Sequence, residues 1–335
     1  MSATPRSISV VIPTYNRAVL LRRAVDSALA QTVRPTEILI VDDGSTDDTA
    51  TVASTWASPV RYIATPNGGV ARARNVGIAA SRGEWIALLD SDDEWEPEKL
   101  AQQCRALDAA PDARWCITGC TLVDGDGNPR PGRQSWEATF PVFSELRDTP
   151  AEYFAHALQP LGDDRYTGDL YETLFRGNVI LPSSALLHRS VFEQCGTFDP
   201  EFRYAEETQF FHRVAAAFPV VVLLAALVRY RVAQSGSLTS SANTQKLITN
   251  ALKSLDHAAT LRSPTQSSRV AYSDGRRSLL LRMAYARLSE RDTRGARSAA
   301  AQVWTHPRAW SILAASLLPS AVLGGLHTLK RRLRA

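Results

Sequence analysis

The sequence of 335 residues is poor in the residues that build disulfide frameworks and soft metal sites. Its four cysteines form no CxxC pair, and its six histidines are scattered, without an HExxH pair. This spacing argues against a histidine-based metal site and predicts reduced, buried thiols in a cytosolic protein. No signal peptide is recognisable, because a short polar lead passes directly into an apolar run that predicts a strand.

The chain also carries little net charge, because its basic and acidic residues nearly balance. The net charge of +4 is mild and no nucleic-acid-binding motif occurs, so we expect no nucleic-acid partner. The last eight residues, TLKRRLRA, nevertheless hold four basic residues behind the nearly uncharged segment 309–327. That segment is just long enough to span a bilayer, but Pro319 and three serines dilute its hydrophobicity. Three interpretations stay open: a spanning helix, an interfacial segment whose basic tail contacts anionic lipid, and a docking helix.

Short apolar runs alternate with helical patterns in the N-terminal third. The runs that predict buried strands are residues 8–12, 37–41, 60–64 and 85–89. Helical patterns follow the first three, at residues 18–30, from about residue 46, and at residues 70–81. Such alternation predicts right-handed βαβ crossovers and a mainly parallel sheet covered on both faces, which is an α/β fold. We also expect a helix that starts with Pro97, a strand at 114–123, and helices from about residue 245 onward.

Three of the predicted strands end in polar motifs. The first strand is followed by PTYNR, the second by DDGSTD and the fourth by DSDDE. In open α/β sheets ligands bind beyond the carboxyl ends of the strands. The three motifs therefore predict one common binding site.

The last of these motifs carries the sharpest signal, Asp90-Ser91-Asp92, extended by Asp93. Two carboxylates from one tight turn suit a hard divalent cation such as Mg²⁺ or Mn²⁺, which keeps open positions for phosphate. The alternative is an acidic lead into the helix at Pro97, where negative charge favours the helix dipole. That alternative explains the later acids of the run well, but explains Asp90, attached to a buried strand, poorly.

Other polar residues fall where they could face the same crevice. Asp43 follows the second strand, where it would accept hydrogen bonds from a base or ribose, or else cap a helix together with Ser45. Arg72 and Arg74 lie near the start of the third helix, so one would face phosphate while the other is solvated. Glu206 and Glu207 begin an apolar-aromatic helix, on which adjacent side chains diverge by about 100°, so at most one faces a given site.

Residues 124–128, DGDGN, briefly imitate a calcium-binding loop. The EF-hand pattern then needs a glycine where Pro129 stands and a glutamate where Ser135 stands. We therefore expect a hairpin turn at this place.

Four motifs of the chain together resemble the inverting glycosyltransferases of family 2, which have the GT-A fold. They are, in order, SVVIPTYNR, VDDGSTDDT, NGGVARARNVGIAASRGEWIALLDSDD and GTFDPEFRYAEETQFFHRV. The resemblance covers roughly residues 7–240 and is to the bacterial type that builds surface polysaccharides. It implies a Rossmann-like catalytic domain over residues 1–240, divided into a nucleotide half at about 7–125 and an acceptor half at about 126–240. Residues 241–335 would form a C-terminal helical region with an apolar and basic tail.

The resemblance implies a role for each matching residue. Asp43 would contact the base, usually uracil, and Arg74 would lie close to the nucleotide. Asp90 and Asp92, with Ser91 between them, would form the DxD motif that holds the ribose and, through Mn²⁺ or Mg²⁺, the diphosphate. The donor site would be completed by Pro13, Thr14 and Tyr15 at the base and by Asp93 at the donor sugar.

The same resemblance places the catalytic base in the motif Ala205-Glu206-Glu207. In the family this motif usually reads AED and its Asp is the base, so the position falls on Glu207, with Glu206 beside it. Glu207 would take the proton from an acceptor hydroxyl as that oxygen attacks the anomeric carbon. The metal would stabilise the charge on the departing diphosphate. One displacement inverts the anomeric carbon and needs no covalent nucleophile.

Acceptor recognition is expected of the variable residues 134–185, which include Trp136, Phe140, Tyr166 and Tyr171. Trp95 would either stack on an acceptor sugar or pack in the core.

The sequence thus predicts a metal-dependent transferase that moves a sugar from a nucleoside-diphosphate sugar, expected to be a UDP-sugar, to a hydroxyl group. The acceptor would be a glycan or a lipid-linked molecule in cell-surface polysaccharide synthesis. Its expected location is cytoplasmic, peripheral on the inner face of the cell membrane. Two alternatives stay open. One is a sugar nucleotidyltransferase, although PTYNRAVL lacks the glycine-rich phosphate loop of such enzymes. The other is a degenerate transferase kept as a scaffold, which only the unusual Glu207 supports.

Overall fold

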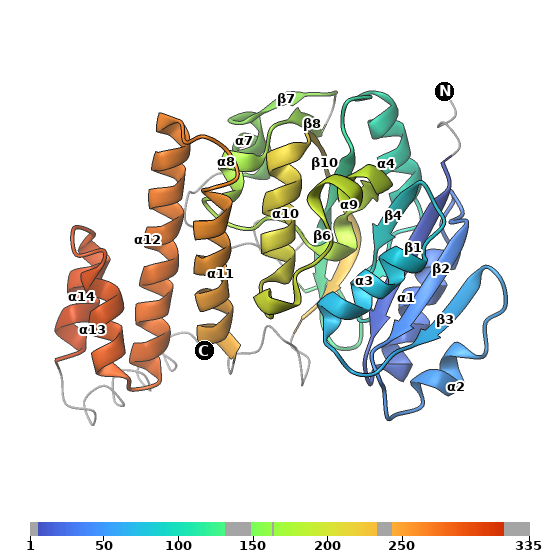
Figure 1. Ribbon diagram of the computed structural model, residues 1–335, viewed down its shortest axis with the longest axis horizontal. Helices are drawn as coiled ribbons and strands as arrows, with labels where there is room; N and C mark the ends of the chain where they lie inside the picture. The colour runs from blue at the N-terminus through green and yellow to red at the C-terminus, as the bar shows by residue number, and fades with distance from the viewer. Residues whose placement is uncertain (1–5, 131–148, 163, 233–242, 318–335) are drawn as a thin grey trace.

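The computed structural model of the protein describes residues 6–130, 149–162, 164–232 and 243–317. Figure 1 shows a twisted sheet in one half of the molecule and a row of helices leading away from it. Trp136 and Phe140, which were expected to contact the acceptor, lie outside the described residues, and so does the basic tail.

One ten-stranded sheet forms the centre of the protein, in the order β3-β2-β1-β4-β9-β6-β10-β8-β7, with β5 paired to β10. Seven of the described strands run in one direction, and β5, β8 and β9 run against them. This confirms the predicted α/β fold with a mainly parallel sheet. The strands are β1 (Ile8–Thr14), β2 (Glu37–Asp42), β3 (Val60–Ala64), β4 (Trp85–Leu88), β5 (Glu94–Trp95), β6 (Trp115–Val123), β7 (Leu158–Pro160), β8 (Arg165–Gly168), β9 (Leu186–His188) and β10 (Val220–Arg231).

Helices cover both faces of this sheet, and β1 shows how its alternating side chains divide between them. Val11 belongs to a core cluster shared with α3 and α10, whereas Val10 and Ile12 belong to a second cluster shared with α1 and α4. Successive side chains of a strand point to opposite faces, so an all-apolar strand serves two cores at once. These helices are α1 (Ala18–Leu29), α2 (Thr49–Ala53), α3 (Val70–Ala80), α4 (Lys99–Asp108), α9 (Arg189–Cys195) and α10 (Glu206–Ala217).

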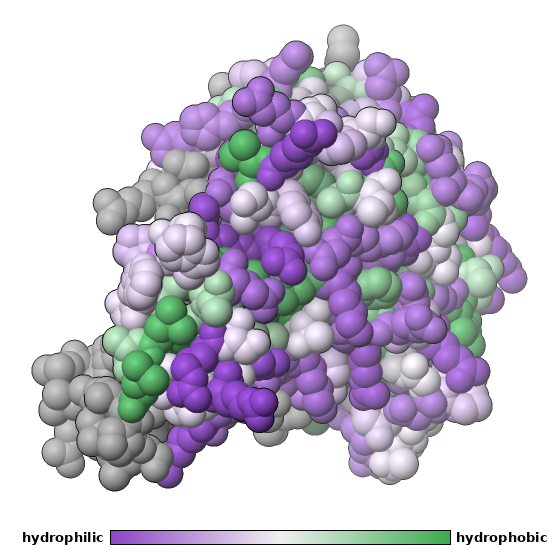
Figure 2. Space-filling model, turned by 60° about the vertical axis from the view of Figure 1, so that its left-hand side comes forward, coloured by the Kyte–Doolittle hydropathy of each residue, from purple (hydrophilic) through white to green (hydrophobic). Residues whose placement is uncertain are grey.

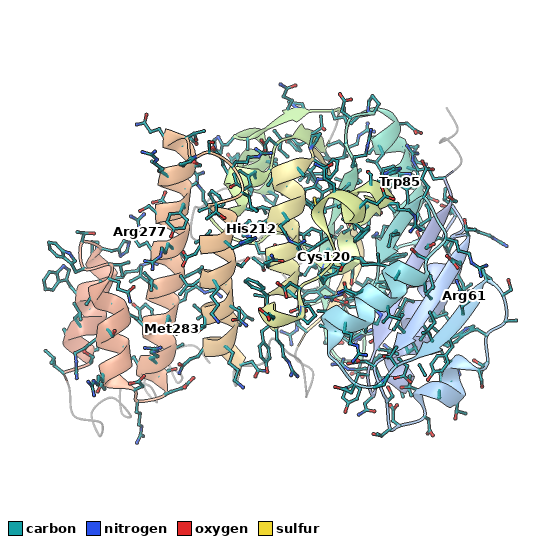
Figure 3. All side chains as sticks on the ribbon, in the orientation of Figure 1. Arg61, Trp85, Cys120, His212, Arg277 and Met283 are labelled. Carbon is teal, nitrogen blue, oxygen red and sulfur yellow. The ribbon has the colours of Figure 1, made fainter. Side chains whose placement is uncertain are left out.

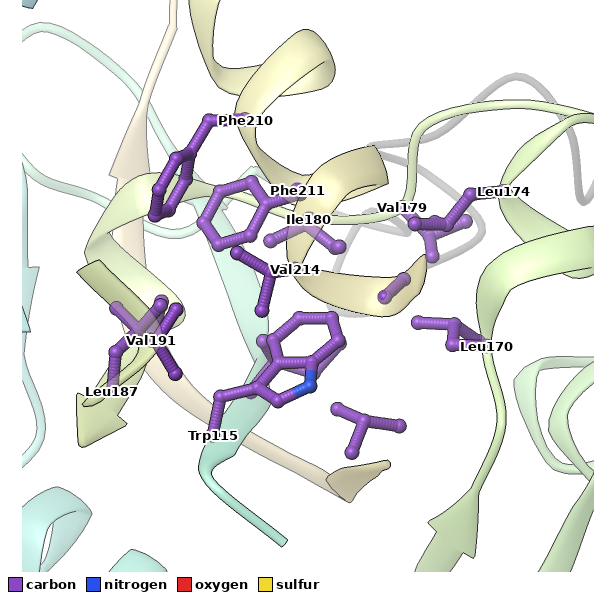
Figure 4. Packing of buried hydrophobic residues seen from close by; sticks show 14 of the residues in the cluster. Trp115, Leu170, Leu174, Val179, Ile180, Leu187, Val191, Phe210, Phe211 and Val214 are labelled. Carbon is purple, nitrogen blue, oxygen red and sulfur yellow. The ribbon is translucent and has the colours of Figure 1, made fainter. Parts of the chain in front are cut away.

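Aromatic residues fill the larger core cluster (Figure 4). The rings of Trp115 and Phe211 are stacked with centroids 5.9 Å apart, and Phe211 meets Phe210 edge-on at 5.3 Å. This packing fixes α10 on the sheet, which matters because α10 begins with Glu206 and Glu207. Short elements from the irregular region border the cluster: α7 (Pro150–Ala155), α8 (Tyr171–Leu174) and the 3₁₀ turn Pro182–Ser184.

The C-terminal helices continue from this core. They are α11 (Thr244–Ala258), α12 (Gln266–Ser289), α13 (Thr293–Ala301) and α14 (Pro307–Ala315). His212, marked in Figure 3, hydrogen-bonds Ser254 of α11 at 3.3 Å, and burial lowers its pKa to about 4. Leu255 and Ala271 join the core cluster of α10, whereas α13 and α14 form a separate cluster with α12. Among the described residues no helix is both long and apolar enough to cross a membrane.

Several local expectations agree with the structure and others do not. All four cysteines are free, and three of them are buried. The turn at residues 124–128 is confirmed, because Val123 pairs with Pro129 and the Asp124 carboxylate accepts the amide of Asn128 at 2.9 Å. Helix α2 begins at Thr49, three residues later than expected. The Thr46 amide donates to the Asn16 side chain in the loop before the helix. Strand β10 was not anticipated, nor were β7 to β9.

Helix α12 crosses the loop after α8 so closely that only glycine fits at position 275. A Cβ atom on Gly275 would lie 1.7 Å from the carbonyl oxygen of Phe175. We expect Gly275→Ala to force the two segments apart and to lower the free energy of unfolding by about 1–3 kcal/mol in a denaturant titration. Gly125→Ala is the matched control, because nothing lies within 4 Å of its added Cβ. Equal stability of the two variants would contradict this close contact.

Candidate functional site

The polar motifs that follow β1, β2 and β4 converge at one edge of the sheet. Thr14 and Asp42 are paired residues at the ends of β1 and β2, and the Asp43 amide donates to the Thr14 carbonyl oxygen at 2.9 Å. Asp90 follows β4 by two residues. The first turn of α10 lies against this edge, because Glu206 and Asp90 bind the same arginine.

Asp43 links two of the loops at this edge. Its carboxylate oxygens accept the main-chain amides of Gly68 and Gly69 at 2.7 and 2.8 Å. The side chain of Asn67 donates to the Asp43 carbonyl oxygen at 2.9 Å. Asp43 therefore fixes the loop before α3 and does not cap α2, which corrects one of the two interpretations. Ser45 does not cap α2 either, since its hydroxyl accepts the Asn16 amide. The contact between Asp43 and a base stays a prediction.

The residues expected at the base differ in exposure. Pro13 and Thr14 are buried, and among the described residues the Thr14 hydroxyl has no hydrogen-bond partner. Tyr15 is 47% exposed. Buried hydroxyl groups are normally satisfied, so the unpaired Thr14 group marks a place where a bound ligand or water would complete the structure.

Arg74 connects the two halves of the site. Its Nη2 donates to Asp90 at 2.7 Å and its Nη1 to Glu206 at 3.3 Å, and its guanidinium lies 5.2 Å from the ring of Phe198. Burial alone would lower the pKa of Arg74, but the two carboxylates outweigh it and raise this pKa. The side chain is only 4% exposed. Arg74 is thus buried and not solvated, while its neighbour Arg72 is exposed. The expected closeness of Arg74 to the nucleotide stays a prediction.

Asp92 is partly exposed at the same edge of the sheet. Its carboxylate accepts Nη1 of Arg17 at 2.8 Å, and about a quarter of its side chain remains exposed. Burial raises the pKa of Asp92, Arg17 lowers it and the nearby Asp90 raises it again. The residue between the two acids, Ser91, is buried.

Asp93 and Trp95, which follow Asp92 closely in sequence, face the interior instead. The Asp93 carboxylate accepts the Ser183 hydroxyl at 2.6 Å and the Arg231 amide at 3.1 Å, and burial raises its pKa well above the usual range. Its expected contact with the donor sugar therefore gains no support. Trp95 is 3% exposed and donates to the Ser183 carbonyl oxygen at 2.8 Å, with its ring 4.1 Å from Nζ of the buried Lys99. The acceptor role of Trp95 was wrong, and the core-packing interpretation is the correct one.

The two glutamates at the start of α10 have different surroundings. Glu206 is buried and paired with Arg74, and its second carboxylate oxygen has no partner in the part of the chain that the structure describes. Glu207 is half-buried, and burial together with the negative charge of Glu206 raises its pKa to about 8. Glu207 is thus a carboxylate that binds a proton far more tightly than an ordinary glutamate does.

Arg231, the last residue of β10, was missed by the sequence analysis. Its side chain is fully buried and donates to the main-chain oxygens of Asp92 (3.1 Å), Asp124 (2.8 Å) and Gly125 (2.9 Å). It also pairs with the carboxylate of Glu94. One guanidinium group therefore joins the turn after β4 to the turn after β6. No sequence signal marks it, because nothing in an apolar strand predicts where its last side chain points.

A divalent cation suits this collection of charges. Within the described part of the chain, no three His, Cys, Asp or Glu side chains stand ready as a complete metal cluster. Mg²⁺ and Mn²⁺ do not need one, since one or two carboxylates plus substrate phosphates are sufficient. Negative charge exceeds positive charge at the site, so added positive charge would be favourable. The acids are Asp90, Asp92, Asp93, Glu94, Glu206 and Glu207, and the arginines are Arg17, Arg74 and Arg231.

Comparison with known proteins identifies a family for the N-terminal part. Residues 9–159 match the sequence model of glycosyl transferase family 2. An uncharacterized glycosyltransferase of Rickettsia prowazekii is 41% identical over 100 residues, which is 30% of this chain and 31% of that protein. The succinoglycan biosynthesis protein ExoO of Rhizobium meliloti is 41% identical over 122 residues, 36% of this chain and 35% of that protein. The chain thus spans about a third of the length of these relatives.

A solved structure shares the fold over nearly the whole chain. The mannosyltransferase PcManGT from Pyrobaculum calidifontis, in complex with GDP-Man and Mn²⁺, superposes with a TM-score of 0.61. The superposition covers 98% of this chain and 81% of that protein at 18% sequence identity. At this identity the likeness establishes the fold alone.

The surroundings of Glu207 predict a pH-dependent effect on stability. Its pKa is about 8 in the folded chain against an ordinary 4.5, so the folded state holds a proton that the unfolded state releases between these values. The stability that Glu207 contributes is complete below pH 4.5 and is lost as pH rises towards 8. Gln does not titrate, so we expect the melting temperature of Glu207→Gln to exceed that of the wild type by an amount that grows from pH 5 to pH 8. The difference then levels off.

Thermal unfolding without nucleotide or metal measures this difference. Glu193→Gln, which changes an exposed glutamate of α9, is the control and should show no such trend. A constant difference for Glu207→Gln across the whole pH range would contradict the raised pKa.

Proposed function

From the match of residues 9–159 to glycosyl transferase family 2, we propose that the protein is an inverting glycosyltransferase. It moves a sugar from a nucleoside-diphosphate sugar, expected to be a UDP-sugar, to a hydroxyl group of a glycan or lipid-linked acceptor in cell-surface polysaccharide synthesis. The observation that carries this proposal is the bridge through Arg74. It brings the Asp90–Asp92 pair and the start of α10, with Glu207, to one edge of the sheet.

The donor class is supported from two directions. Asp43 and the residues after β1 stand beyond the carboxyl ends of neighbouring strands, where nucleotides bind in open α/β sheets. A protein of the same fold, PcManGT, binds GDP-Man. The part in polysaccharide synthesis is supported by the similarity to ExoO, a succinoglycan biosynthesis protein.

Glu207 is the proposed catalytic base. It accepts the proton of the acceptor hydroxyl as that oxygen attacks the anomeric carbon from the face opposite the leaving nucleoside diphosphate. Its raised pKa makes it a stronger base than an ordinary carboxylate, and a pKa near the working pH is favourable for proton transfer. Glu206 has a different task, because its carboxylate is held by Arg74. The longer side chain of Glu207 is compatible with this chemistry.

Asp92 and Asp90 are the residues that would hold Mn²⁺ or Mg²⁺. When bound, such an ion stabilises the negative charge that develops on the departing diphosphate. The excess of carboxylates over arginines at the site and the partial exposure of Asp92 support this assignment. Arg17 lies beside Asp92 and neutralises part of its charge.

The proposed location is the cytoplasm, with peripheral contact to the inner face of the cell membrane. A lipid-linked acceptor would be met there. No structural observation favours the nucleotidyltransferase alternative, and the scaffold alternative differs from our proposal in having no turnover.

We expect a nucleoside diphosphate with Mn²⁺ to raise the melting temperature of the protein. A ligand at 100 times its Kd stabilises the folded state by about 2.7 kcal/mol. Asp92→Asn should abolish this shift because it removes one carboxylate of the ion's binding pair. Asp112→Asn, at an exposed position remote from the motif in sequence, should keep it.

The base is tested in the same assay together with nucleotide release from donor sugars. Glu207→Gln should retain the shift in melting temperature but lose roughly 10²–10⁴-fold in the rate of nucleotide release. Absence of a shift with every nucleotide would overturn the donor proposal. A shift without turnover in the wild type would favour the scaffold alternative.

A further inference from the structure

The outer side of α14 and the turn before it exposes large apolar side chains. Trp304 is 60% exposed, Trp310 58% and Leu317 74%. Trp310 lies within α14, whereas Leu317 lies in the turn just beyond its last residue, Ala315. The opposite side of α14 is already used, because Ala309 and Ile312 are buried in the cluster shared with α12 and α13.

Helix α14 thus buries Ala309 and Ile312 on its inner side and exposes Trp310, together with Arg308 and Ser311, on its outer side. A surface helix normally turns a polar face to water, so an exposed tryptophan on that face is unusual. Contiguous exposed apolar side chains on a soluble domain mark interaction sites. In Figure 2, a few hydrophobic side chains gather near the lower left edge of the molecule.

The charge around this surface selects the partner. Residues 293–335 contain seven basic residues and no acidic one. The net charge of +4 is thus divided into +7 in this part and −3 in the rest of the chain. Arg294 and Arg308 are exposed on α13 and α14. An anionic surface would attract this end of the molecule and repel the remainder, which also orients the protein.

We propose that the surface formed by Trp304, Trp310 and Leu317, hereafter the α14 surface, docks onto a lipid bilayer that contains anionic headgroups. Tryptophan is enriched at membrane interfaces, where its apolar body enters the acyl boundary and its N–H group meets the headgroups. Basic residues near an anionic membrane add about 1 kcal/mol each, which is about fivefold in binding. An interfacial segment of this kind lies on the membrane and does not span it.

This inference deepens the proposed function, since it rests on the proposed membrane location and names the surface that makes the contact. Its test requires no catalysis. A second copy of the chain is the main competing occupant, because the same apolar side chains could pair with themselves. The excess of positive charge disfavours that pairing, since two α14 surfaces would bring like charges together.

The experiment is co-sedimentation of the full chain with vesicles. We expect binding to phosphatidylglycerol–phosphatidylcholine vesicles, weaker binding as salt is raised, and little binding to phosphatidylcholine alone. Trp304→Ser with Trp310→Ser should weaken binding by on the order of tenfold or more, because each Trp would lose its apolar burial. Val270→Ser is the control, since Val270 is 51% exposed on α12 and lies outside the α14 surface.

Two additional readouts separate the possible outcomes. The double variant should keep its melting temperature and its nucleotide-dependent shift, so that failure of docking and failure of the donor proposal remain distinguishable. Brominated phosphatidylglycerol should quench tryptophan fluorescence in the wild type and quench it less in the variant with both tryptophans changed to Phe. Three results would overturn the proposal. The first two are equal binding to neutral vesicles and unchanged vesicle binding by the double variant. The third is a wild-type dimer in solution that becomes monomeric in the double variant but not in Val270→Ser.

Discussion

The pairing of Arg74 with Asp90 and Glu206 is the interaction on which the site depends. Each of these groups is costly to bury alone, and breaking a buried ion pair leaves an uncompensated charge. Arg74 comes from α3, Asp90 from the turn after β4 and Glu206 from the first turn of α10. These contacts join α3 to α10 at the edge of the sheet, although Arg74 and Glu206 are 132 positions apart in sequence. The contact between Arg74 and Glu206 also fixes Glu207, because Glu207 is the next residue of the same helix.

Arg231 acts in a similar way on the other side of the acidic turn. It holds the main chain of Asp92 and the Glu94 carboxylate, while its amide holds Asp93. The acids at residues 90–94 thus fall into two groups, one that points into the protein and one that stays partly exposed. Asp93 and Glu94 are bound by Ser183 and Arg231, whereas Asp90 and Asp92 stay partly exposed, each paired with one arginine. Burial is the main cause of the raised pKa of Glu207, and the negative charge of Glu206 adds to it.

The sequence predicts the parts of this arrangement that arise locally. The strands β1 to β4 follow from short apolar runs, and the carboxyl-end rule places their polar motifs together. Directions of side chains depend on tertiary contacts that no local pattern reveals. Trp95 looks like a sugar-stacking residue until Ser183, 88 positions away, takes its indole N–H. The sequence likewise does not reveal that α10 places Glu206 beside Arg74. Arg231 has no signal at all, since its partners come from two turns distant in sequence.

The most direct test of the central claim is hydrogen exchange in Arg74→Met, a variant that keeps an unbranched apolar stem but removes the charged guanidinium group. If Arg74 holds both segments, amides in residues 88–96 and 202–210 should lose protection together, while amides of β2 keep theirs. Unchanged protection in either segment would contradict the account, and so would an equal loss of protection throughout the sheet.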